Sequence, residues 1–583
     1  MLTAAKHSAE STGRTFSTLA NKSSLSYADK LSRLMPCAAS FSRIGRSALP
    51  MSSKATVTNL VDVLRSWGDR DDETLSIAAK RILQLPKRLS DLNMKVDNIK
   101  IDEVLTNPIT QATSVRNLSL HFSNHLPHVT IYDPHNTEHH SLSKRIVTYA
   151  ITNLDDHKVA NVVRVSFPVS GAITKGGIRV LPYEGPGNET SHSMIELEEG
   201  AAQLAQGMKE KISCVGLDQL TDNGLGFKLS GGKTEVSMPF HWEGLEAKQA
   251  LFAAKGLIAA TTLPLGIYDT PAPDMRSGPA EMDAYCQALK EAGVKHPGFW
   301  ITGKGTQGAH PLRPQATGEG VAEILRQTLK MEGAPFSIHE AKIAVQGAGN
   351  VGEYTMKSLV ENDGAKIVVM SDVGGALSLE TGFNQSNLSD AMKVIKGQLS
   401  LFDFNARHHT DAKLYDHDNI WKLGANTFIP AANKNSVDLQ ALMLASQTTP
   451  VVIVCGANNA LSEETIHQLD SASFPHGVYI VPPEIANPGG VAGSALEMDS
   501  SRLGIDWHSP VGKERQTSDK QALQNMMKNM FKKIMGTHIS AVEKGRGYVA
   551  RNTFVEASSK EPLVTNPSLK KPDYLALDLS SLT

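Results

Sequence analysis

The chain has 583 residues, too many for one ordinary hydrophobic core, so we expect two domains with tails. Hydrophobic residues make up 40% and charged residues 20%, which excludes a chain that is disordered throughout. The formal net charge of -2 gives no basic footprint for nucleic acid, so we expect no such partner. The most apolar stretch, residues 251–268, contains Lys255 and threonines, so it falls short of a membrane span and predicts a buried helix.

The first 50 residues are rich in serine and basic residues and contain only two acids, Glu10 and Asp29. This bias is typical of a transit peptide, so we expect residues 1–50 to be one and the protein to reach the mitochondrial matrix. The alternatives are a disordered tail, a plastid location, or a cytoplasmic protein that starts at Met51. Residues 558–583 are also expected to form a tail.

The cysteines lie far apart in the sequence, with neither a disulfide framework nor a zinc-ligand spacing. They are Cys37, Cys214, Cys286 and Cys455. We therefore expect reduced thiols and no metal site.

Two patterns describe the first half of the chain. Apolar residues recur at helical spacing from residue 59 to about 105, which predicts helices. The runs HVTIY, KRIVTYAI and ANVVRVSFPV, between residues 128 and 180, predict the strands of one sheet. We place a first domain at 51–325 and expect an amphipathic helix at about 520–545 to join it.

A strand, glycines and a helix follow one another in the second half. The stretch AKIAVQGAGN at 341–350, the helical pattern to about Glu361 and the strand AKIVVMSD predict a βαβ unit. Further strands at 426–432 and 450–457 predict a parallel, helix-flanked sheet over 326–519. The expected fold is therefore α/β, with two domains and a cleft between them.

The segment GAGNVG has the spacing of a dinucleotide-binding turn. Gly347, Gly349 and Gly352 stand where such a turn needs a tight bend, close approach of the backbone to pyrophosphate, and close contact between helix and strand. The amino end of the following helix attracts the diphosphate. Asp372 ends the next strand, as expected of the acid that binds ribose. We therefore predict a Rossmann-type domain at 326–519.

Three lysines of the first domain stand near glycines or in a helical pattern. They are Lys175 in TKGGIR, Lys211 in LAQGMKEK and Lys233 in SGGK. The segment PAPDM holds Asp274 in a loop made rigid by prolines. One acid with several lysines suits an anionic amino acid as substrate.

These segments resemble the glutamate/leucine/phenylalanine/valine dehydrogenase superfamily, and glutamate dehydrogenases most of all. The resemblance runs from about residue 165 to 500 and follows the family's order of motifs. The motifs are TKGGIR, LAQGMKEK, SGGK, DTPAPDM, ITGKGTQGAHPLRPQATGEGV, IAVQGAGNVG, FIPAAN, GANN and IANPGGVAGSALEM. It implies reversible oxidative deamination of L-glutamate to 2-oxoglutarate and ammonium, with hydride transfer to NAD or NADP.

The resemblance also implies residue roles. Lys233 would be the catalytic lysine that positions the water attacking the iminium, and Asp274 would shuttle protons. A lysine among other cations in a closed cleft has a lowered pKa, which suits it to act as a base. Lys211 would hold the α-carboxylate, while Lys175 and Ser494 would hold the side-chain carboxylate.

The resemblance also implies that residues 51–325 bind substrate and mediate dimerisation. It implies that the protein forms a homohexamer and takes part in nitrogen assimilation. The further substrate contacts are Arg313 and Val491. The implied dinucleotide contacts are Thr317, Gly347, Gly349, Asn350, Val351, Gly352, Ser371, Asp372, Asn458 and Asn487.

Two lysines compete for the α-carboxylate. A QxxK pattern selects Lys209, whereas LAxxMxxK selects Lys211. We favour Lys211 because Lys209 is turned by about 100° from the expected buried stripe of the helix. That stripe is expected to consist of Leu197, Ala201, Leu204 and Met208.

Two other functions compete with glutamate oxidation. A leucine, valine or phenylalanine dehydrogenase would place an aliphatic side chain against Lys175, and an unpaired buried ammonium costs several kcal/mol. A catalytically weak metabolite-binding relative would have no need of Asp274 as a proton shuttle. The segments around 184–192 and 215–227 are longer than the family pattern, and Thr234 and Glu235 replace its usual glycines.

The end of the second Rossmann strand leaves the choice of cofactor open. Asp372 would accept hydrogen bonds from the ribose of NAD and repel the 2′-phosphate of NADP. The segment from Ser371 to Gly375 nevertheless resembles the SDSxG loop of NADP-linked glutamate dehydrogenases. We favour NADP because the likeness covers the whole loop.

The transit-peptide hypothesis can be tested on native protein. We expect the mature chain to lack most of residues 1–50, because import removes such peptides. Mass spectrometry of the native amino terminus measures this. Met1 or an acetylated Leu2 on the abundant form would contradict it.

Overall fold

The computed structural model describes residues 57–542 and Leu579, apart from 68–69, 124–125, 133–140, 155–157, 184–191, 221–224, 241–243, 306–308, 332–333, 459, 470–471, 473 and 475. The expected transit peptide at 1–50 and most of the expected tail at 558–583 lie outside the described residues. Most of the long segment at 184–192 and residues 221–224 of the long segment at 215–227 also lie outside the described residues. Cys214, Cys286 and Cys455 are buried free thiols, and Cys37 is not described.

The chain begins with helices and then changes to a strand earlier than the sequence pattern indicates. Helices α2 (Val57–Leu64) and α3 (Asp72–Ser90) are followed by strand β1 (Met94–Thr106), so the helical prediction is wrong from residue 94 onward. Asn93, at φ 57°, turns the chain out of the helix. Ile99 and Ile101 are then buried on either side of exposed Lys100, which is the period of a strand.

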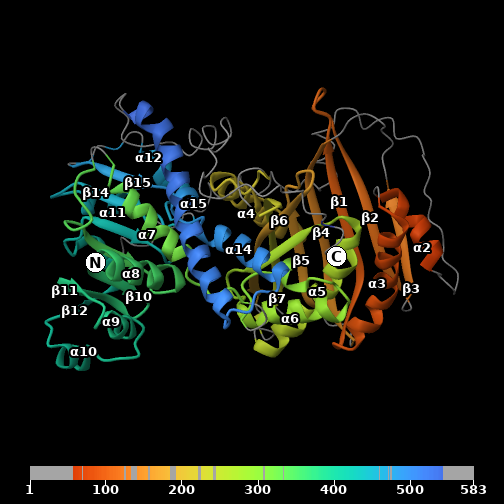
Figure 1. The fold of residues 1–583 in the computed structure, drawn as a ribbon, viewed down its shortest axis with the longest axis horizontal. Helices are drawn as coiled ribbons and strands as arrows, with labels where there is room; N and C mark the ends of the chain where they lie inside the picture. Colours follow the sequence, from red (N-terminus) through yellow and green to blue (C-terminus); the bar gives the residue numbers. More distant parts are fainter. Residues whose placement is uncertain are drawn as a thin grey trace, which may run out of the picture. The chain divides into compact units, whose positions relative to one another are not determined.

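The first sheet has eight strands in the order β3-β2-β1-β4-β5-β7-β6-β8 (Figure 1). Pairing is antiparallel from β3 to β7, whereas β6 is parallel to both β7 and β8. After β1, its strands are β2 (Thr113–Ser123), β3 (Leu126–Tyr132), β4 (Ser141–Asn153), β5 (Lys158–Ser166), β6 (Ala172–Tyr183), β7 (Lys228–Pro239) and β8 (Asp269–Pro273). The strands predicted between 128 and 180 are confirmed.

Alternation along these strands gives the sheet two different faces. Val163 and Val165 of β5 pack against helix α4 (Met194–Cys214), while Arg164 between them faces the other way. The opposite face meets helices α5 (Leu245–Thr262) and α6 (Pro279–Glu291), and the short helix η4 (Leu263–Leu265) continues α5. The apolar stretch at 251–268 is thus largely a buried helix, as predicted. None of the described helices is long and apolar enough to cross a membrane.

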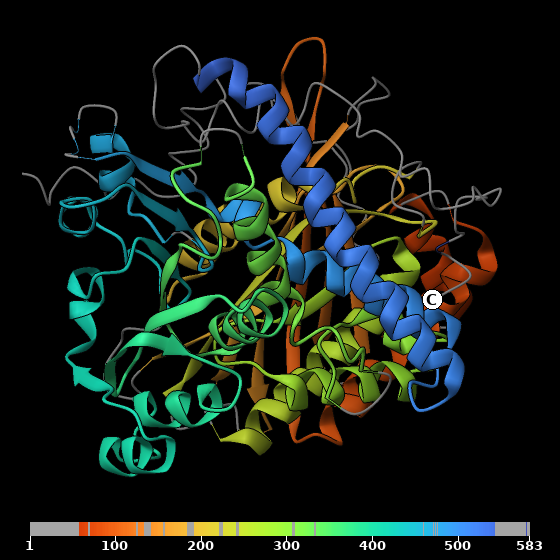
Figure 2. The same ribbon diagram turned by 60° about the vertical axis from the view of Figure 1, so that its left-hand side comes forward.

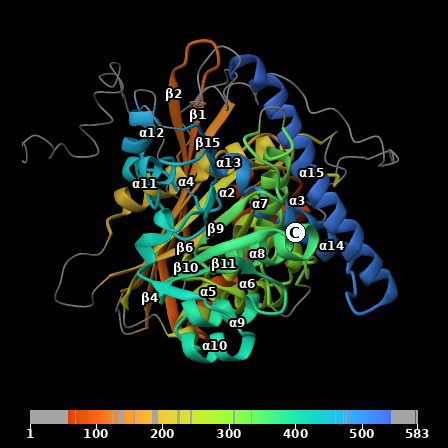
Figure 3. The same cartoon turned by 90° about the vertical axis from the view of Figure 1, so that its left-hand side faces the viewer.

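The second sheet has seven strands in the order β12-β11-β10-β9-β13-β14-β15, and Figure 3 shows β9 to β11 beside helix α8. The strands β10, β9, β13, β14 and β15 pair in parallel, as predicted, but β11 is antiparallel to both of its neighbours, β10 and β12. The difference arises at Gly375, whose φ of 127° lets the chain fold straight back along β10. The bounds are β9 (Lys342–Gln346), β10 (Lys366–Asp372), β11 (Gly375–Phe383), β12 (Lys413–Tyr415), β13 (Thr427–Pro430), β14 (Val451–Val454) and β15 (Val478–Val481).

Helices surround the second sheet. They are α7 (Ala316–Thr328), α8 (Asn350–Asp363), α9 (Leu388–Ile395), α10 (Leu401–His408), α11 (Leu439–Ala445), α12 (Glu463–Leu469), α13 (Pro483–Ala486) and α14 (Gly489–Leu503). Short turns of 3-10 helix complete the chain: η2 (Arg65–Trp67), η5 (Pro297–Trp300) and η6 (His417–Lys422). Both sheets belong to one compact unit within residues 49–583.

Helix α15 (Pro510–Val542) starts ten residues before the predicted 520 and runs as one long helix across α7 and α14 (Figure 2). Met527 contacts Gly320 of α7, and Lys520 forms an ion pair with Glu319 at 2.9 Å. Its predicted apolar positions are buried where they are described: Leu523, Met527, Met530, Phe531 and Ile534. The helix therefore holds α7 and α14 together at the edge of the cleft described next.

Candidate active site

A cavity of about 700 Å³ lies between elements of the two sheets. Strands β6 and β7, the turn after β8 and helix α4 form one wall. Helices α7, α8 and α14 and the turns after β13 and β14 form the other. The predicted residues that line it are Lys175, Lys211, Lys233, Asp274, Arg313, Thr317, Val351, Asn458, Asn487, Val491 and Ser494. The fold thus brings together in one cleft residues that are up to 319 positions apart (Lys175 to Ser494).

Lys233 Nζ is in direct contact with a carboxylate oxygen of Asp274 on one wall of the cavity. Lys233 is 4% exposed on β7, and Asp274 follows the last residue of β8. The two side chains approach each other across Gly177 of β6, where an added Cβ would stand 2.8 Å from Asp274 Cβ and 3.1 Å from Lys233 Nζ. A side chain at 177 would therefore force the pair apart.

The pKa of Lys233 lies well below its ordinary value. Burial is the main cause, because it removes water from the ammonium, and the positive charges of Arg179 and Lys211 add to it. Glu235 opposes the shift. The arrangement favours a neutral amine, which is the form that can accept a proton.

Lys175 and Arg313 form a second cationic group at the far end of the cavity. Lys175 is 2% exposed, and among the described residues no carboxylate lies within ion-pair distance of its Nζ. Burial, followed by the charge of Arg313, holds the pKa of Lys175 well below its ordinary value. Arg313 Nε is buried without a hydrogen-bond partner in the described structure. Two buried cationic side chains with unused donors indicate a place for an anion.

Ser494 closes this end of the cavity. Its hydroxyl donates to the carbonyl of Gly490 at 2.8 Å and lies 3.5 Å from Thr302 Oγ1. Gly490 itself lies against Thr317, since a Cβ there would stand 2.4 Å from Thr317 Oγ1. Ser494 and Val491 therefore enter the cavity from the first turns of α14, beside α7.

Lys211 reaches across the cleft to the other wall. Its Nζ donates to Asn458 Oδ1, which also accepts a hydrogen bond of 2.9 Å from Asn487 Nδ2. Burial lowers the pKa of Lys211 to about 8. Lys209 instead lies with its Nζ 5.8 Å from the centre of the Phe167 ring and does not line the cavity. Of the two lysines, Lys211 is the one placed for a substrate.

The buried stripe of α4 differs from the expected one. Leu197 and Ala201 are buried as expected, but the stripe continues through Ala205 and Ile212, while Leu204 and Met208 are only partly buried. The reason is the four-residue step of the helix face that meets the sheet. Lys211 lies next to Ile212 and is still 92% buried, since its exposed fraction is 8%.

The glycine-rich turn joins β9 to α8. Gly347 has a φ of 94°, and a Cβ on Gly352 would stand 1.9 Å from the carbonyl oxygen of Gly347. At Gly349 no atom lies within 4 Å of where a Cβ would be, so the backbone faces open space. Helix α8 starts at Asn350 without a side-chain cap, leaving amide groups free for an anion. These features fit a dinucleotide diphosphate.

The acid and the serine at the end of β10 have different surroundings. Asp372 accepts hydrogen bonds from the amides of Ala348 at 3.3 Å and Val373 at 2.9 Å, so its carboxylate faces the glycine-rich turn. Ser371, the next-to-last residue of β10, is 2% exposed. The role that the resemblance implies for its hydroxyl stays a prediction.

Among the lining residues that were not identified as site residues from the sequence are Arg179, Met208, Asn433 and Lys434. Arg179 lies 3.7 Å from Asp274 and belongs to the same TKGGIR motif as Lys175, so the motif could have indicated it. Met208 lies in LAQGMKEK, and Asn433 and Lys434 follow FIPAA. Lys434 has no periodic or motif signal that distinguishes it from a solvated lysine. No group of three or more potential metal ligands occurs in the described part of the chain.

Comparisons with known proteins show similarity to amino-acid dehydrogenases. A family model described as Glutamate/Leucine/Phenylalanine/Valine dehydrogenase matches residues 308–558. The NADP-specific glutamate dehydrogenase of Chlorella sorokiniana is 30% identical over 273 residues, which are 46% of this chain and 49% of that protein. The enzyme of the same name from Neurospora crassa is 26% identical over 420 residues, 70% of this chain and 84% of that protein. The chain thus spans about half of the first relative and most of the second.

Solved structures resemble the whole described fold. The crystal structure of Plasmodium falciparum glutamate dehydrogenase has a TM-score of 0.55 at 18% identity, covering 86% of this chain and 91% of that chain. A second glutamate dehydrogenase from the same organism has a TM-score of 0.53 at 19% identity. At this identity the likeness concerns the fold, and it confirms the predicted α/β architecture.

The lowered pKa of Lys211 predicts how stability changes with pH. An unfolded lysine titrates near pH 10.4, so between about pH 8 and 10.4 the unfolded chain binds more protons than the folded protein. The contribution of Lys211 to the free energy of unfolding therefore rises with pH over this range. The rise is roughly 1.4 kcal/mol for each unit by which folding lowers the pKa of Lys211. We expect the urea midpoint of wild type, relative to Lys211→Met, to increase between pH 8 and 10. Parallel curves for the two proteins would refute the assignment.

Proposed function

Because this chain belongs to the glutamate/leucine/phenylalanine/valine dehydrogenase superfamily, we propose that its cleft catalyses reversible oxidative deamination of L-glutamate to 2-oxoglutarate and ammonium. It is an oxidoreductase that uses NADP. The observation that carries the proposal is the set of three buried lysines, Lys175, Lys211 and Lys233, in one cleft beside a dinucleotide-binding turn.

The two carboxylates of glutamate meet different lysines. Lys211, held by Asn458, binds the α-carboxylate near the Rossmann wall. Lys175 and Arg313 bind the side-chain carboxylate at the other end, and Ser494 closes that end. An aliphatic substrate would leave the charge of Lys175 buried without a partner, at a cost of several kcal/mol. This favours glutamate over leucine, valine or phenylalanine.

The chemistry depends on Lys233 and Asp274. When bound, the nicotinamide supplies the acceptor for the α-hydrogen, which leaves as hydride. Neutral Lys233 takes a proton from the water that attacks the iminium carbon of the substrate. Asp274, in contact with Lys233 Nζ, passes that proton to the amino nitrogen of the adduct. The new hydroxyl then gives its proton to Lys233 while the carbonyl forms, the carbon–nitrogen bond breaks and ammonia leaves. The side chains that line the cavity keep other water out.

The glycine-rich turn and its neighbours hold the dinucleotide. Gly347, Gly349 and Gly352 let the backbone meet the diphosphate, and the amides of Asn350 and Val351 point to it from the start of α8. Thr317, Asn458 and Asn487 line the cavity where the nicotinamide enters. The donor set is the backbone's own, so it fits the diphosphate of either cofactor.

The 2′-phosphate of NADP needs a cation near the loop after β10. The amide of Gly374 donates to the carbonyl of Ile395 at 2.8 Å, which places Lys396 beside that loop. Lys396 Nζ lies 3.8 Å from Glu353 in the first turn of α8, and the side chain is 31% exposed. Lys396 can therefore offset the charge of Asp372 and meet the phosphate.

Assembly and location follow from the same proposal. The chain forms homohexamers in the mitochondrial matrix and serves nitrogen assimilation. The support is the family resemblance for the hexamer and the composition of residues 1–50 for the location.

A spectrophotometric assay tests the activity directly. Purified full-length chain should reduce NADP in the presence of glutamate, and norvaline and leucine should be poor substrates. A chain that binds 2-oxoglutarate but reduces no cofactor would instead be a metabolite-binding relative. Faster turnover of leucine than of glutamate would indicate the other branch of the superfamily.

Lys233→Ala should lower kcat for glutamate by about 10²–10⁴-fold, because a lost general base has that effect. Binding of NADP, measured by fluorescence, should be retained, since the glycine-rich turn lies on the opposite wall. Lys209→Ala, an exposed lysine on α4, serves as the control. A Lys233 variant that keeps more than about a tenth of wild-type kcat would contradict the role.

Lys175→Leu should lower kcat/KM for glutamate by about 30-fold or more, because a buried charge partner is worth roughly 2–5 kcal/mol. The value for norvaline, which lacks the side-chain carboxylate, should change far less. The ratio of the two losses in kcat/KM measures how much Lys175 contributes to recognition of the side-chain carboxylate. Equal losses on both would show that Lys175 has another function.

Lys396→Ala should lower kcat/KM for NADP by about tenfold, since a hydrogen bond to a charged group contributes roughly 1.5–3 kcal/mol. The value for NAD should change less than about twofold. Lys393→Ala is the matched control, because Lys393 pairs with Asp390 on the same helix. A similar loss with both cofactors would place the phosphate elsewhere.

A further inference from the structure

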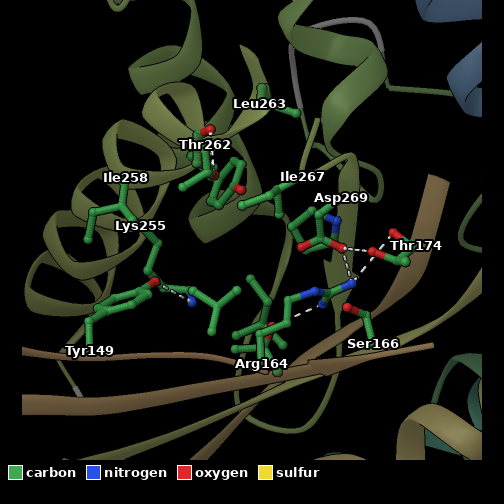
Figure 4. A pocket seen from close by; sticks show the side chains of 16 residues that line it. Tyr149, Arg164, Ser166, Thr174, Lys255, Ile258, Thr262, Leu263, Ile267 and Asp269 are labelled. Carbon is green, nitrogen blue, oxygen red and sulfur yellow. Dashed lines mark hydrogen bonds and ion pairs between the residues drawn. The ribbon is translucent and has the colours of Figure 1, made fainter. Parts of the chain in front are cut away.

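A second, smaller cavity lies on the other face of the first sheet, between the sheet and helices α5 and α6 (Figure 4). Its volume is about 50 Å³. A single water needs about 10–15 Å³ by the same measure, so the cavity has room for a few water-sized groups. Figure 4 shows Lys255 entering from α5 and Arg164 from the sheet.

Arg164 and Asp269 balance each other on one side of this cavity. They form a direct ion pair, and Thr174 Oγ1 donates to Asp269 Oδ1 at 2.8 Å. Arg164 Nη1 donates to Thr234 Oγ1 at 3.0 Å. Arg164 Nε is buried and has no hydrogen-bond partner in the described structure. The pair is therefore neutral as a whole but keeps one unused donor.

Lys255 has no such balance. It is 5% exposed, and its Nζ donates to the Tyr149 hydroxyl at 3.2 Å. Among the described residues no carboxylate lies within 4 Å of this Nζ, so at most one of three ammonium donors has a protein partner. A buried ammonium without a counter-charge either loses its proton or takes up an anion.

We propose that this cavity is a binding site for a small monovalent anion, of the size of chloride or bromide, held chiefly by the ammonium of Lys255. The hydroxyls of Tyr149 and Tyr285 line the same space, as does the side chain of Arg164. The volume excludes organic acids with more than a few heavy atoms. The residues that line this cavity are distinct from those that line the cleft on the opposite face of the sheet.

Binding is coupled to a proton. Burial, with a further contribution from Arg164, lowers the pKa of Lys255 to about 7, and Asp269 opposes the shift. The other titratable groups that face it are Tyr149 of β4 and Tyr285 of α6, while Arg81 of α3 binds the α5 backbone at Ala260. An anion stabilises the ammonium, so its affinity rises as the pH falls toward 7. Above that value it decreases by about tenfold per pH unit.

The site communicates with the cleft through the strands they share. Thr174 and Thr234 line the small cavity, and their neighbours Lys175 and Lys233 line the cleft on the opposite face. The charge of Arg164 already lowers the pKa of both lysines. Below the pKa of Lys255, where that side chain is already an ammonium, an anion beside Arg164 offsets this effect and raises the pKa of Lys233. On the proposed function, this moves the acid limb of the kcat/KM profile to higher pH.

Bromide is the probe, because it is a monovalent anion that can be located by anomalous scattering. Crystals of the full-length protein are soaked in sodium bromide at pH 6.5 and at pH 8.5. We expect an anomalous peak beside Lys255 Nζ, stronger at pH 6.5. Thermal unfolding in bromide against gluconate, at equal ionic strength, gives the affinity in solution, since gluconate is too large for the cavity.

Lys255→Met keeps the length of the side chain and removes the charge. It should abolish the anomalous peak. The bromide concentration needed for a given rise in Tm should increase at least tenfold. Lys290→Met, at an exposed position of α6, should behave as wild type. If Lys255→Met is unstable, the wild-type map alone decides, because water without bromide in the cavity overturns the proposal. A peak that persists unchanged in Lys255→Met overturns it as well.

Failure of this inference and failure of the proposed function remain distinct. Glutamate oxidation without bromide in the cavity rejects the anion site alone. Bromide in the cavity of a protein that oxidises no glutamate rejects the proposed function alone. With both present, an unchanged pH profile between bromide and gluconate rejects the coupling between the two faces.

Discussion

The burial of ammonium groups with too few carboxylates is the constraint on which this cleft depends. Lys175, Lys211 and Lys233 are each less than a tenth exposed, and Asp274 is the carboxylate in contact with one of them. Removing such charges from water costs several kcal/mol for each group, even after the protein relaxes. On the proposed function, the two carboxylates of the substrate return the missing counter-charges, so the same burial that lowers the lysine pKa values also favours such a ligand.

Glycines allow this concentration of charge. Gly177 lets Asp274 reach Lys233, and a Cβ on Gly232 would stand 2.4 Å from Arg164 Nη2. Gly176 lies so close to β7 that a Cβ would overlap the carbonyl of Gly232. The parallel pairing of β6 with β7 therefore depends on missing side chains. Because β6 and β7 pair closely, residues of these two strands line the cleft on one face of the sheet and the smaller cavity on the other.

Glu497 of helix α14 connects that helix to the loop at residues 303–304. Its carboxylate forms a buried ion pair of 2.7 Å with Lys304 and accepts the amide of Gly303 at 2.8 Å. Its charge also favours the ionised forms of Lys175 and Arg313. Helix α14 thus contributes Val491 and Ser494 to the cleft from its first turns. The carboxylate of Glu497, one turn further along the helix, supplies a negative charge near Lys175 and Arg313.

The sequence by itself determined the class of protein and most of the chemistry. The glycine spacing at 347–352 and the position of Asp372 predicted the dinucleotide turn, because that turn depends on local backbone conformation. The superfamily resemblance, drawn from nine short motifs, agrees with the family model that matches residues 308–558 and with the similarity to NADP-specific glutamate dehydrogenases, and the α/β fold is confirmed. The role of each site residue remains a prediction.

Only the tertiary structure decided which groups face one another. Strand β1 reads as helix from its local pattern, but pairing with β2 and β4 makes it a strand. Ser371 follows the expected motif, yet the sheet buries it and leaves Lys396, 24 residues beyond Asp372, beside the loop. Lys255 carries no signal of its function in sequence, because its pKa and its partners arise from burial between elements that are distant along the chain.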